Sequence, residues 1–204
     1  MFIANPGNDP DPDVLRWGCT VKSVGGIRVH DLGCGSGRHA KALSASGLSV
    51  VASDIDLTSL KTGTCFRRHG GSVVPVLASL FECPFREASF DGVLAFNVLY
   101  HATWTDMVRA VQALYQTLKP GGLAYLTLAT PDHGSNGRGQ EVEPQTFLPP
   151  SGVLHHFTDR NNAELLLRRF VIKQWNEISF DYVTQKGETI RCVHWRVQAR
   201  REER

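Results

Sequence analysis

The chain lacks a long hydrophobic segment. No stretch of its 204 residues approaches the roughly 18 apolar residues that a membrane-spanning helix needs. The first six residues (MFIANP) also lack the basic and continuously apolar regions of a secretory signal. We therefore expect a soluble, cytoplasmic protein with no membrane partner.

The chain also lacks an excess of charge of one sign. Its 22 lysines and arginines face 20 aspartates and glutamates, which gives a formal net charge of +2. Proteins that bind nucleic acid usually display a basic face, because contacts to phosphates supply much of their affinity. The near-neutral balance disfavours a nucleic-acid partner, and nothing in the sequence specifies an oligomeric state.

Metal-binding patterns are missing as well. The five cysteines are an odd number, and they show neither a C-x-x-C pair nor the cysteine and histidine spacing of zinc sites. His155 and His156 are adjacent and could bind a metal, but no third ligand stands at a recognisable spacing. We expect reduced thiols and no metal cofactor.

What the chain does have is an alternation of strand-like and helix-like segments, which predicts an α/β fold around a mostly parallel sheet. Its length suits one domain, spanning 1–204, with a full core. The expected strands are 27–32, 49–54, 72–77, 90–96, 123–129, and a hairpin of 171–180 and 189–199 with its turn at 185–187. The expected helices are 38–46, 57–68, 103–118 and 163–169, the last capped by Thr158 or Asp159.

A glycine-rich turn, Asp31-Leu32-Gly33-Cys34-Gly35-Ser36-Gly37, follows the first expected strand and precedes a helix. Glycines at alternating positions adopt backbone conformations closed to other residues and let a ligand approach the main chain. The start of the next helix points free N–H groups at such a ligand. A dinucleotide fingerprint would need a third glycine at position 38, where the chain has Arg38, so the spacing disfavours NAD.

The second expected strand ends in Asp54, about 20 residues beyond the glycine turn, where a βαβ unit places the carboxylate that binds a ribose. A carboxylate can accept both hydroxyls of an unphosphorylated ribose. Asp56 is a weaker candidate, because a residue that already enters the next helix is aimed less directly at the sugar. Either aspartate, and Asp56 in particular, could instead cap that helix.

These features resemble the class I methyltransferases that use S-adenosylmethionine. An acidic residue followed by G-x-G-x-G at 31–37 is similar to their motif I, and Leu118-Lys119-Pro120-Gly121-Gly122 is similar to the downstream half of the same fold. The resemblance covers about 27–129, and the run CGSGR with the compact size is similar to the type 11 and tellurite-resistance-like branches. It implies a Rossmann-like, doubly wound, seven-stranded sheet, mostly parallel with an antiparallel last strand.

The resemblance also implies S-adenosylmethionine as the cofactor and a set of residues that bind it. The glycine turn would hold the methionine part, with Cys34 supporting the turn rather than acting as a catalytic thiol. Family members commonly place an Asp after the third strand to meet the adenine, and here Ser79 stands there, so the contact loses its charge; the Leu80 backbone could serve likewise. The expected cofactor-binding set is Asp31, Gly33, Cys34, Gly35, Gly37, Asp54, Ile55, Ser79, Leu80 and Asn97.

The expected catalytic residues, His101 and Tyr100, follow the fourth strand, where the resemblance places the reacting methyl group. His101 is the best general-base candidate, although it could instead pack against the cofactor or cap a helix. A base is required only for an acceptor that keeps its proton at neutral pH, as an alcohol does. Asn97-x-x-Tyr100 superficially resembles the N-P-P-Y motif of amino-group methyltransferases, but both prolines are absent.

Residues 130–157 form an expected insertion after the fifth strand. Its first part, 130–150, is rich in glycine, proline, asparagine and charge, which predicts an irregular segment that is either functional or disordered. The position is at the edge of the sheet where doubly wound folds bind ligands. We predict an active-site loop, with solvated polar residues as the alternative; its ionisable residues include His133, Arg138, Glu141, Glu143, His155 and His156.

Three functions remain open at this point. The leading one is a methyltransferase that acts on a small-molecule acceptor by in-line transfer. The second is transfer to a protein or an RNA, which the charge balance disfavours. The third is a cofactor-binding module without catalysis, which Ser79 in place of the usual Asp slightly favours. The acceptor and its reacting atom cannot be read from the sequence.

Overall fold

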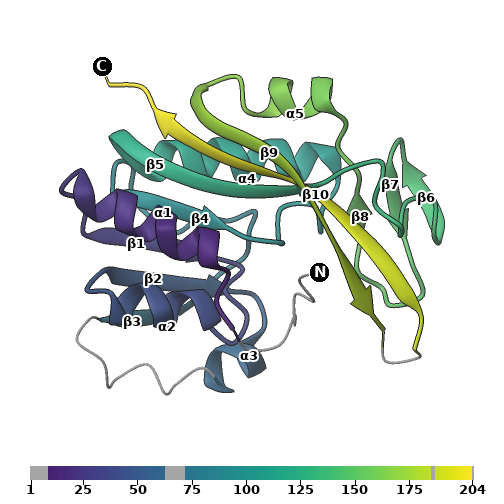
Figure 1. Cartoon of the computed structure of the whole chain (residues 1–204), viewed down its shortest axis with the longest axis horizontal. Helices are drawn as coiled ribbons and strands as arrows, with labels where there is room; N and C mark the ends of the chain where they lie inside the picture. The colour runs from purple at the N-terminus through teal and green to yellow at the C-terminus, as the bar shows by residue number, and fades with distance from the viewer. Residues whose placement is uncertain (1–8, 63–71, 185–186, 204) are drawn as a thin grey trace.

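The computed structural model describes residues 9–62, 72–184 and 187–203, and its main feature is a seven-stranded sheet (Figure 1). β10 runs antiparallel to both of its neighbours, whereas the pairs from β3 to β5 are parallel. The expected mostly parallel sheet with an antiparallel last strand is confirmed. In spatial order the strands are β3 (Val73–Leu77), β2 (Ser49–Asp54), β1 (Arg28–Leu32), β4 (Phe90–Ala95), β5 (Leu118–Ala129), β10 (Thr189–Arg201) and β9 (Phe170–Val183).

Helices cover both faces of this sheet, α1 and α2 on one and α4 and α5 on the other (Figure 1). Successive side chains of a strand point to opposite faces, so the two faces share each strand. On β4, for example, Val93 packs in the cluster with α4, and Leu94 packs in the cluster with α1. The described helices are α1 (Pro12–Ser23), α2 (Arg38–Ala45), α3 (Leu57–Thr62), α4 (Trp104–Thr117) and α5 (Arg160–Leu166).

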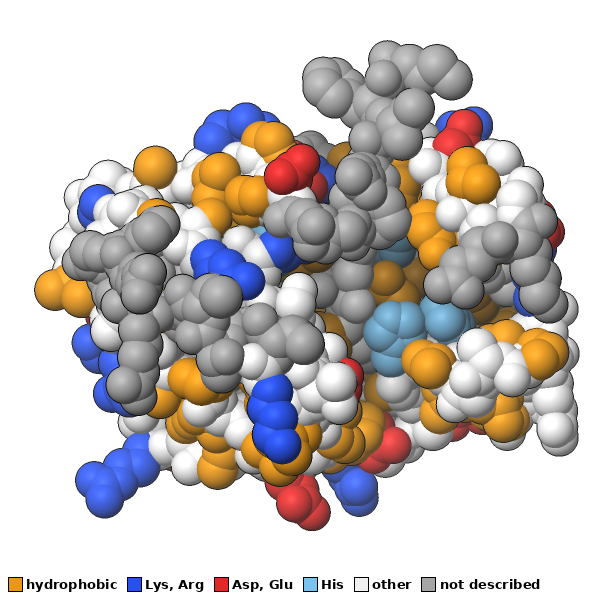
Figure 2. All heavy atoms as spheres, turned by 90° about the horizontal axis from the view of Figure 1, so that it is seen from below, with side chains coloured by type: hydrophobic (Ala, Val, Ile, Leu, Met, Phe, Trp, Pro, Cys, Tyr) orange, Lys and Arg blue, Asp and Glu red, His pale blue; other side chains and the backbone are white. Residues whose placement is uncertain are grey.

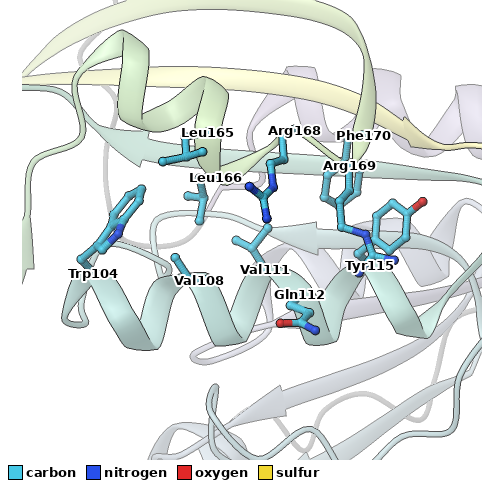
Figure 3. A pocket seen from close by; sticks show the side chains of 10 residues that line it. All are labelled: Trp104, Val108, Val111, Gln112, Tyr115, Leu165, Leu166, Arg168, Arg169 and Phe170. Carbon is cyan, nitrogen blue, oxygen red and sulfur yellow. The ribbon is translucent and has the colours of Figure 1, made fainter.

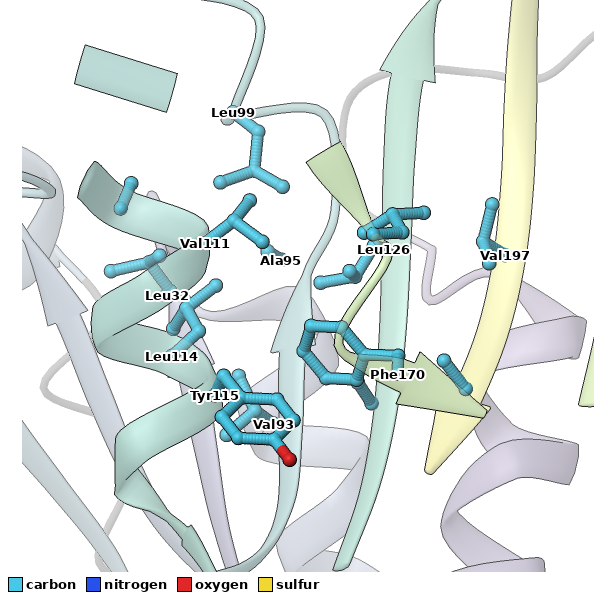
Figure 4. Packing of buried hydrophobic residues seen from close by; sticks show 14 of the residues in the cluster. Leu32, Val93, Ala95, Leu99, Val111, Leu114, Tyr115, Leu126, Phe170 and Val197 are labelled. Carbon is cyan, nitrogen blue, oxygen red and sulfur yellow. The ribbon is translucent and has the colours of Figure 1, made fainter. Parts of the chain in front are cut away.

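The larger core cluster lies between the sheet and α4 (Figure 4). On α4 the buried residues Met107, Val111 and Leu114 recur at spacings of three or four, which places them on one side of the helix. They meet strand residues such as Leu126, and burying each large aliphatic side chain stabilises the fold by roughly 1.5–3 kcal/mol. This packing fixes the segment between β4 and α4, which carries the expected catalytic residues.

Helix α1 is an element that the sequence interpretation did not predict. Its signals are present in the chain: the Asp11 side chain accepts the N–H of Asp13, and Pro12 occupies the first turn. Val14 and Trp17 follow at helical spacing and are fully buried against the sheet. The helix lies before the first strand, outside the alternation of strands and helices that predicts the other elements.

The insertion contains a small antiparallel sheet of β6 (Gln140–Glu143), β7 (Thr146–Leu148) and β8 (His155–His156). The expectation of an irregular segment over 130–150 was therefore wrong for β6 and β7. Main-chain bonds tie the insertion to the large sheet, because the N–H of His156 donates to the Tyr100 carbonyl (2.8 Å) and the N–H of Thr158 donates to the Ala129 carbonyl (2.8 Å). Contacts this distant along the chain cannot be read from composition.

The structure also differs from the predictions at the ends of some strands and helices. β5 begins at Leu118 instead of 123, with a register irregularity opposite β4 that the positive φ of Gly121 (77°) accommodates. Asp159, one of the two expected caps, accepts the N–H of Asn162 at the start of α5. The predicted helix over 57–68 is described only through α3, and the rest of it lies outside the described residues, as do 185–186 of the hairpin turn.

Arg196 of β10 joins the last strand to the start of α1. Its guanidinium pairs with the carboxylates of Asp11 and Asp13, each at 2.5 Å, and the arginine side chain is only 16% exposed. A guanidinium that binds two carboxylates in this way holds them in a defined orientation and also balances their charge. The bond to Asp11 spans 185 positions along the chain.

A groove of about 300 Å³ lies between α4 and α5 (Figure 3). Its lining includes Trp104, Tyr115, Arg168 and Arg169, and none of its residues belongs to the expected cofactor-binding set. Among the described segments, no helix combines the length and the apolar character that crossing a membrane requires.

Candidate active site

The glycine turn connects the end of β1 to the start of α2. Gly33, Gly35 and Gly37 have φ values of 64°, 54° and 78°, the left-handed region that favours glycine. A β-carbon at Gly35 would meet nothing within 4 Å, so the main chain here is open to a ligand. The N–H of Cys34 donates to the Ser53 carbonyl (3.0 Å), which holds the turn against β2.

The turn also contacts the segment after β4. A β-carbon at Gly33 would lie 2.2 Å from Cγ2 of Val98, so only glycine fits there. Asn97 has a φ of 55°; its N–H donates to Thr127 Oγ1 (2.6 Å), which donates back to Asn97 Oδ1 (3.1 Å). The Gly33–Val98 approach places the post-β4 segment directly against the glycine turn, and the Asn97 bonds fix that segment to β5.

Asp31 is a buried carboxylate with an incomplete set of partners. Its side chain is 2% exposed, and Oδ2 has no hydrogen-bond partner in the part of the chain that is described. Burial raises the pKa of Asp31 to about 7, against the opposing effects of the Ala40 N–H and of Arg38. A buried oxygen of this kind is well suited to a cationic group of a ligand.

Asp54 and Asp56 have different environments. Asp54 Oδ2 accepts the N–H of Gly35 (2.7 Å), which brings this carboxylate to the glycine turn. Asp56 is fully exposed and accepts the N–H of Thr58 (2.9 Å) and the hydroxyl of Ser59 (2.7 Å), as a helix cap does. The geometry favours Asp54 over Asp56 as a ligand at the turn.

Tyr100 and His101 lie among three further histidines: His155 on β8, His133 after β5 and His194 on β10. The ring centroids are 4.5 Å apart for Tyr100 and His101 and 4.6 Å apart for His101 and His155. Those of Tyr100 and His194 are separated by 5.3 Å, and those of His133 and His194 by 5.2 Å. We call these five residues the histidine cluster.

Burial keeps the histidine cluster uncharged at neutral pH. It lowers the pKa of His101 and of His133 to about 4, and that of His194 to about 3. Burial also raises the pKa of the Tyr100 hydroxyl. The cluster is therefore polar but carries no charge at neutral pH. Histidine side chains are visible in a recess of the molecule (Figure 2).

His101 is held by the insertion. Its Nδ1 lies 3.1 Å from the Leu154 carbonyl, which can only accept, so Nδ1 carries the proton and Nε2 the lone pair. The alternative role of helix cap is taken by Thr103, whose side chain accepts the N–H of Asp106 at the start of α4. The base nitrogen of His101 is therefore Nε2.

His156, next to His155, has a different environment. Its Nδ1 bonds to Thr146 Oγ1 (2.7 Å), and that hydroxyl donates to Glu143 (2.9 Å), which also accepts the N–H of Trp104 at the start of α4. This buried chain of bonds anchors the insertion to α4. The two adjacent histidines do not act together, and no metal-binding group is found among the described residues.

His194 is the site residue that sequence reasoning missed. It is 2% exposed, and neither ring nitrogen has a hydrogen-bond partner among the residues that the structure describes. A lone histidine in a strand gives no signal of its own, because only the pairing of β10 with β5 and β9 brings it to the cluster.

A family model described as a methyltransferase domain matches residues 30–126. Over 115 residues the chain is 33% identical to the mitochondrial ubiquinone biosynthesis O-methyltransferase of Mus musculus, covering 52% of this chain and 30% of that protein. Over residues 30–126 the chain is therefore similar to methyltransferases. It is also 33% identical over 132 residues to the demethylmenaquinone methyltransferase of Clavibacter sepedonicus, covering 63% of this chain and 52% of that one.

Solved structures share the fold. An S-adenosylmethionine-dependent methyltransferase from Methanosarcina mazei superimposes with a TM-score of 0.68 at 20% identity, covering 87% of this chain and 93% of that chain. TehB from Haemophilus influenzae superimposes with a TM-score of 0.72 at 16% identity, covering 95% of this chain and 63% of TehB. The matches to the two curated relatives extend over only 30% and 52% of their lengths.

The residues at the turn fit S-adenosylmethionine. The unpartnered Asp31 oxygen suits the ammonium of the methionine part, and the open main chain at Gly35 allows close approach. Asp54 lies beside the glycine turn through its bond to the Gly35 N–H, and Ile55 next to it is 73% exposed. Burial raises the pKa of the Cys34 thiol, which disfavours a catalytic thiolate at this position.

Ser79 and Leu80 follow β3 as expected. The Ser79 hydroxyl oxygen accepts the N–H of Phe81 (3.1 Å), and its own proton stays available to a ligand. Leu80 is partly buried against the larger core. The segment after β3 therefore offers a hydroxyl rather than a carboxylate at position 79.

Replacing Asp54 with alanine should weaken S-adenosylmethionine binding by about 1–3 kcal/mol, because charge-assisted hydrogen bonds to the ribose are lost. Titration calorimetry measures the change as a roughly 5- to 150-fold rise in Kd. Asp56→Ala is the matched control and should leave Kd within about twofold, since Asp56 caps α3. If Asp56→Ala raised Kd and Asp54→Ala did not, Asp56 would be the residue that binds the ribose.

Asp31 should make stability depend on pH. A carboxyl whose pKa is about 7 when folded and near 4 when unfolded stabilises the fold below pH 4 and loses that contribution as pH rises to 7. We expect Asp31→Asn to melt at a higher temperature than the wild type at pH 8, and to lose the advantage at pH 4. Thermal unfolding at both pH values tests this, and S-adenosylmethionine should stabilise the wild type more than the variant at pH 8.

Proposed function

We propose that this methyltransferase transfers the methyl group of S-adenosylmethionine to a small-molecule acceptor bound at the histidine cluster. The observation that carries the proposal is the contact of Gly33 with Val98. It joins the glycine turn to the segment that leads to His101, whose N–H donates to the Val98 carbonyl (3.1 Å). A cofactor in the turn and an acceptor at the cluster would therefore be neighbours.

The bound cofactor would supply a methyl group activated on a sulfonium. The chain has to hold the acceptor's lone pair in line with that carbon and exclude water. For a hydroxyl acceptor, His101 Nε2 would take the proton, because Nδ1 is engaged with Leu154 and the ring is neutral. Tyr100, protonated and buried, would pack beside the acceptor.

The insertion, 130–157, would form one wall of the acceptor site. It contributes His133 and His155 to the cluster, and its Leu154 carbonyl orients His101. The bond from the His156 N–H to the Tyr100 carbonyl fixes it to the post-β4 segment. This supports an active-site role for the insertion rather than that of a solvated loop.

A small acceptor is favoured by the neutral, ring-lined cluster and by relatives named for quinone biosynthesis. Transfer to a protein or an RNA is the alternative, and the chain's net charge of +2 supplies little electrostatic attraction for RNA. A binding module without catalysis is the other alternative, for which Ser79 in place of a carboxylate is the argument.

The deciding experiment follows a labelled methyl group from S-adenosylmethionine into cell extract, separated into small-molecule, protein and nucleic-acid fractions. We expect label in the small-molecule fraction. Label in protein or RNA would support the macromolecular alternative. Cofactor binding by calorimetry without label in any fraction would support the non-catalytic module.

A further inference from the structure

The groove between α4 and α5 is long and apolar (Figure 3). The α4 residues that line it include positions 104, 108, 111 and 115, whose spacings of three or four place them on one side of the helix. At a rise of about 1.5 Å per residue these positions span roughly 16 Å. Val111 and Leu166 are buried in the groove, whereas Val108 and Leu165 are 39% and 52% exposed. Apolar surface therefore stays open to water along its length.

Positive charge lies toward the end of the groove away from Trp104 (Figure 3). Arg168 and Arg169 follow α5, and none of the described residues that line the groove is acidic. The guanidinium of Arg169 lies 4.2 Å from the centroid of the Tyr115 ring, a contact that orients a cation without neutralising it. Neither arginine forms an ion pair within the described ranges, and the nearby Glu164 is paired with Arg160 (2.6 Å).

We propose that this groove binds a small amphipathic anion, an unbranched aliphatic carboxylate. Its carboxylate would meet Arg168 and Arg169, and its chain would lie along α4 toward Trp104. Guanidinium groups bind carboxylates through paired N–H bonds, and the chain would remove the exposed apolar side chains from water. A volume of about 300 Å³ is at the lower end of the range for small-molecule sites, roughly 300–1,000 Å³, and spread over this length it suits a single chain better than a compact ring system.

This site is separate from the one proposed for methyl transfer. None of its lining residues belongs to the expected cofactor-binding set or to the histidine cluster. Trp104 joins the two regions, because its N–H donates to Glu143 of β6 (2.5 Å) and its ring lies 5.5 Å from that of His156. A ligand in the groove would therefore contact the residue that ties α4 to the insertion, and its binding requires neither cofactor nor acceptor.

The test titrates decanoate, decan-1-ol and decyltrimethylammonium into the full chain, with calorimetry for affinity and NMR of the tryptophan indole N–H signals for location. Decanoate should bind about tenfold more tightly than decan-1-ol, as expected for two charge pairs partly screened by water, and the cation should bind more weakly than either. The Trp104 signal, assigned with Trp104→Phe, should shift, whereas that of Trp17 on the opposite face of the sheet should not. S-adenosylhomocysteine should change the decanoate Kd by less than about twofold.

Substitutions separate the charged and apolar parts of the groove. Arg168→Gln with Arg169→Gln should bring the ratio of decanoate to decan-1-ol affinity close to one without changing decan-1-ol binding. Arg109→Gln is the matched control, because Arg109 lies on α4 outside the groove and pairs with Asp106 (3.6 Å), and it should leave the ratio unchanged. Leu165→Asn should weaken both ligands.

Arg168→Gln alone should lower the ratio about threefold. The Arg168 side chain has no hydrogen bond or ion pair with another described residue, so this variant serves if the double variant does not fold.

Three results would overturn the inference: equal binding of decanoate and decan-1-ol by the wild type, an unchanged ratio in the double variant, or a Trp104 signal that does not move. Binding to anionic vesicles without binding of decanoate, or a dimer that Leu165→Asn dissociates, would assign the groove to a lipid surface or to a second copy of the chain and would also overturn it. If decanoate binds as expected and S-adenosylhomocysteine does not bind, this inference stands and the proposed function fails.

Discussion

Replacing Gly33 with alanine is expected to abolish S-adenosylmethionine binding, with a loss of more than about 100-fold in affinity. The new β-carbon would lie 2.2 Å from Cγ2 and 2.6 Å from Cβ of Val98, on a backbone with a φ of 64°. Overpacking of this kind typically costs about 1–3 kcal/mol, and the left-handed backbone adds roughly 1–2 kcal/mol. Calorimetry for the cofactor and thermal unfolding for stability measure the two effects.

Two controls separate the clash from the loss of glycine. Gly35→Ala has a comparable φ but meets no atom, so we expect it to destabilise the fold only by the roughly 1–2 kcal/mol of the left-handed backbone, together with weaker cofactor binding. Gly33→Ala combined with Val98→Ala should recover part of the stability. If Gly33→Ala alone bound the cofactor normally, the close approach of the turn to Val98 would be wrong.

Replacing His101 with glutamine is expected to lower the rate of methyl transfer to a hydroxyl acceptor by about 100-fold, the lower end of the range for a general base. The lower end is appropriate because a pKa of about 4 makes His101 a weak base. Single-turnover kinetics with the acceptor identified by labelling measure the rate, and cofactor affinity should change less than twofold. Glutamine keeps a donor for the Leu154 carbonyl, which preserves the local structure.

The pH profile gives an independent readout of His101. Its base form is present above the pKa of about 4, so its titration should leave the wild-type rate unchanged between pH 8 and pH 5 and reduce it below. An unaltered rate in the glutamine variant would show that the acceptor reacts without a base, as a thiolate does.

Much of the fold could be predicted from the sequence because strand and helix periodicities reflect the two faces of the sheet. The run that ends in Asp54 and the α4 pattern around Val111 are examples. Helix α1 and the strands of the insertion escaped prediction for different reasons. α1 precedes the first strand and so lies outside the alternation of strands and helices, whereas β6–β8 are only two to four residues long and form by pairing with one another.

The candidate site, like the fold, could be predicted only in part. The glycine turn, Asp54 and His101 are adjacent in sequence to elements that the periodicity reveals. The role of Asp56 as a cap was an open alternative, and local bonds to Thr58 and Ser59 decide it. His194 and the Gly33–Val98 contact depend on strands pairing far along the chain, which a single sequence does not encode in any local pattern.

The position of β10 has a consequence for synthesis. It is the last described strand in the chain, yet it lies inside the sheet between β5 and β9. The ribosome therefore releases β1 to β5, with the glycine turn, while the edge of β5 is still unpaired, and at about 5–20 residues per second that exposure lasts several seconds. An open strand edge is a template for pairing between chains. The nascent chain should be most prone to aggregation in this interval, and should benefit most from a chaperone that covers β5.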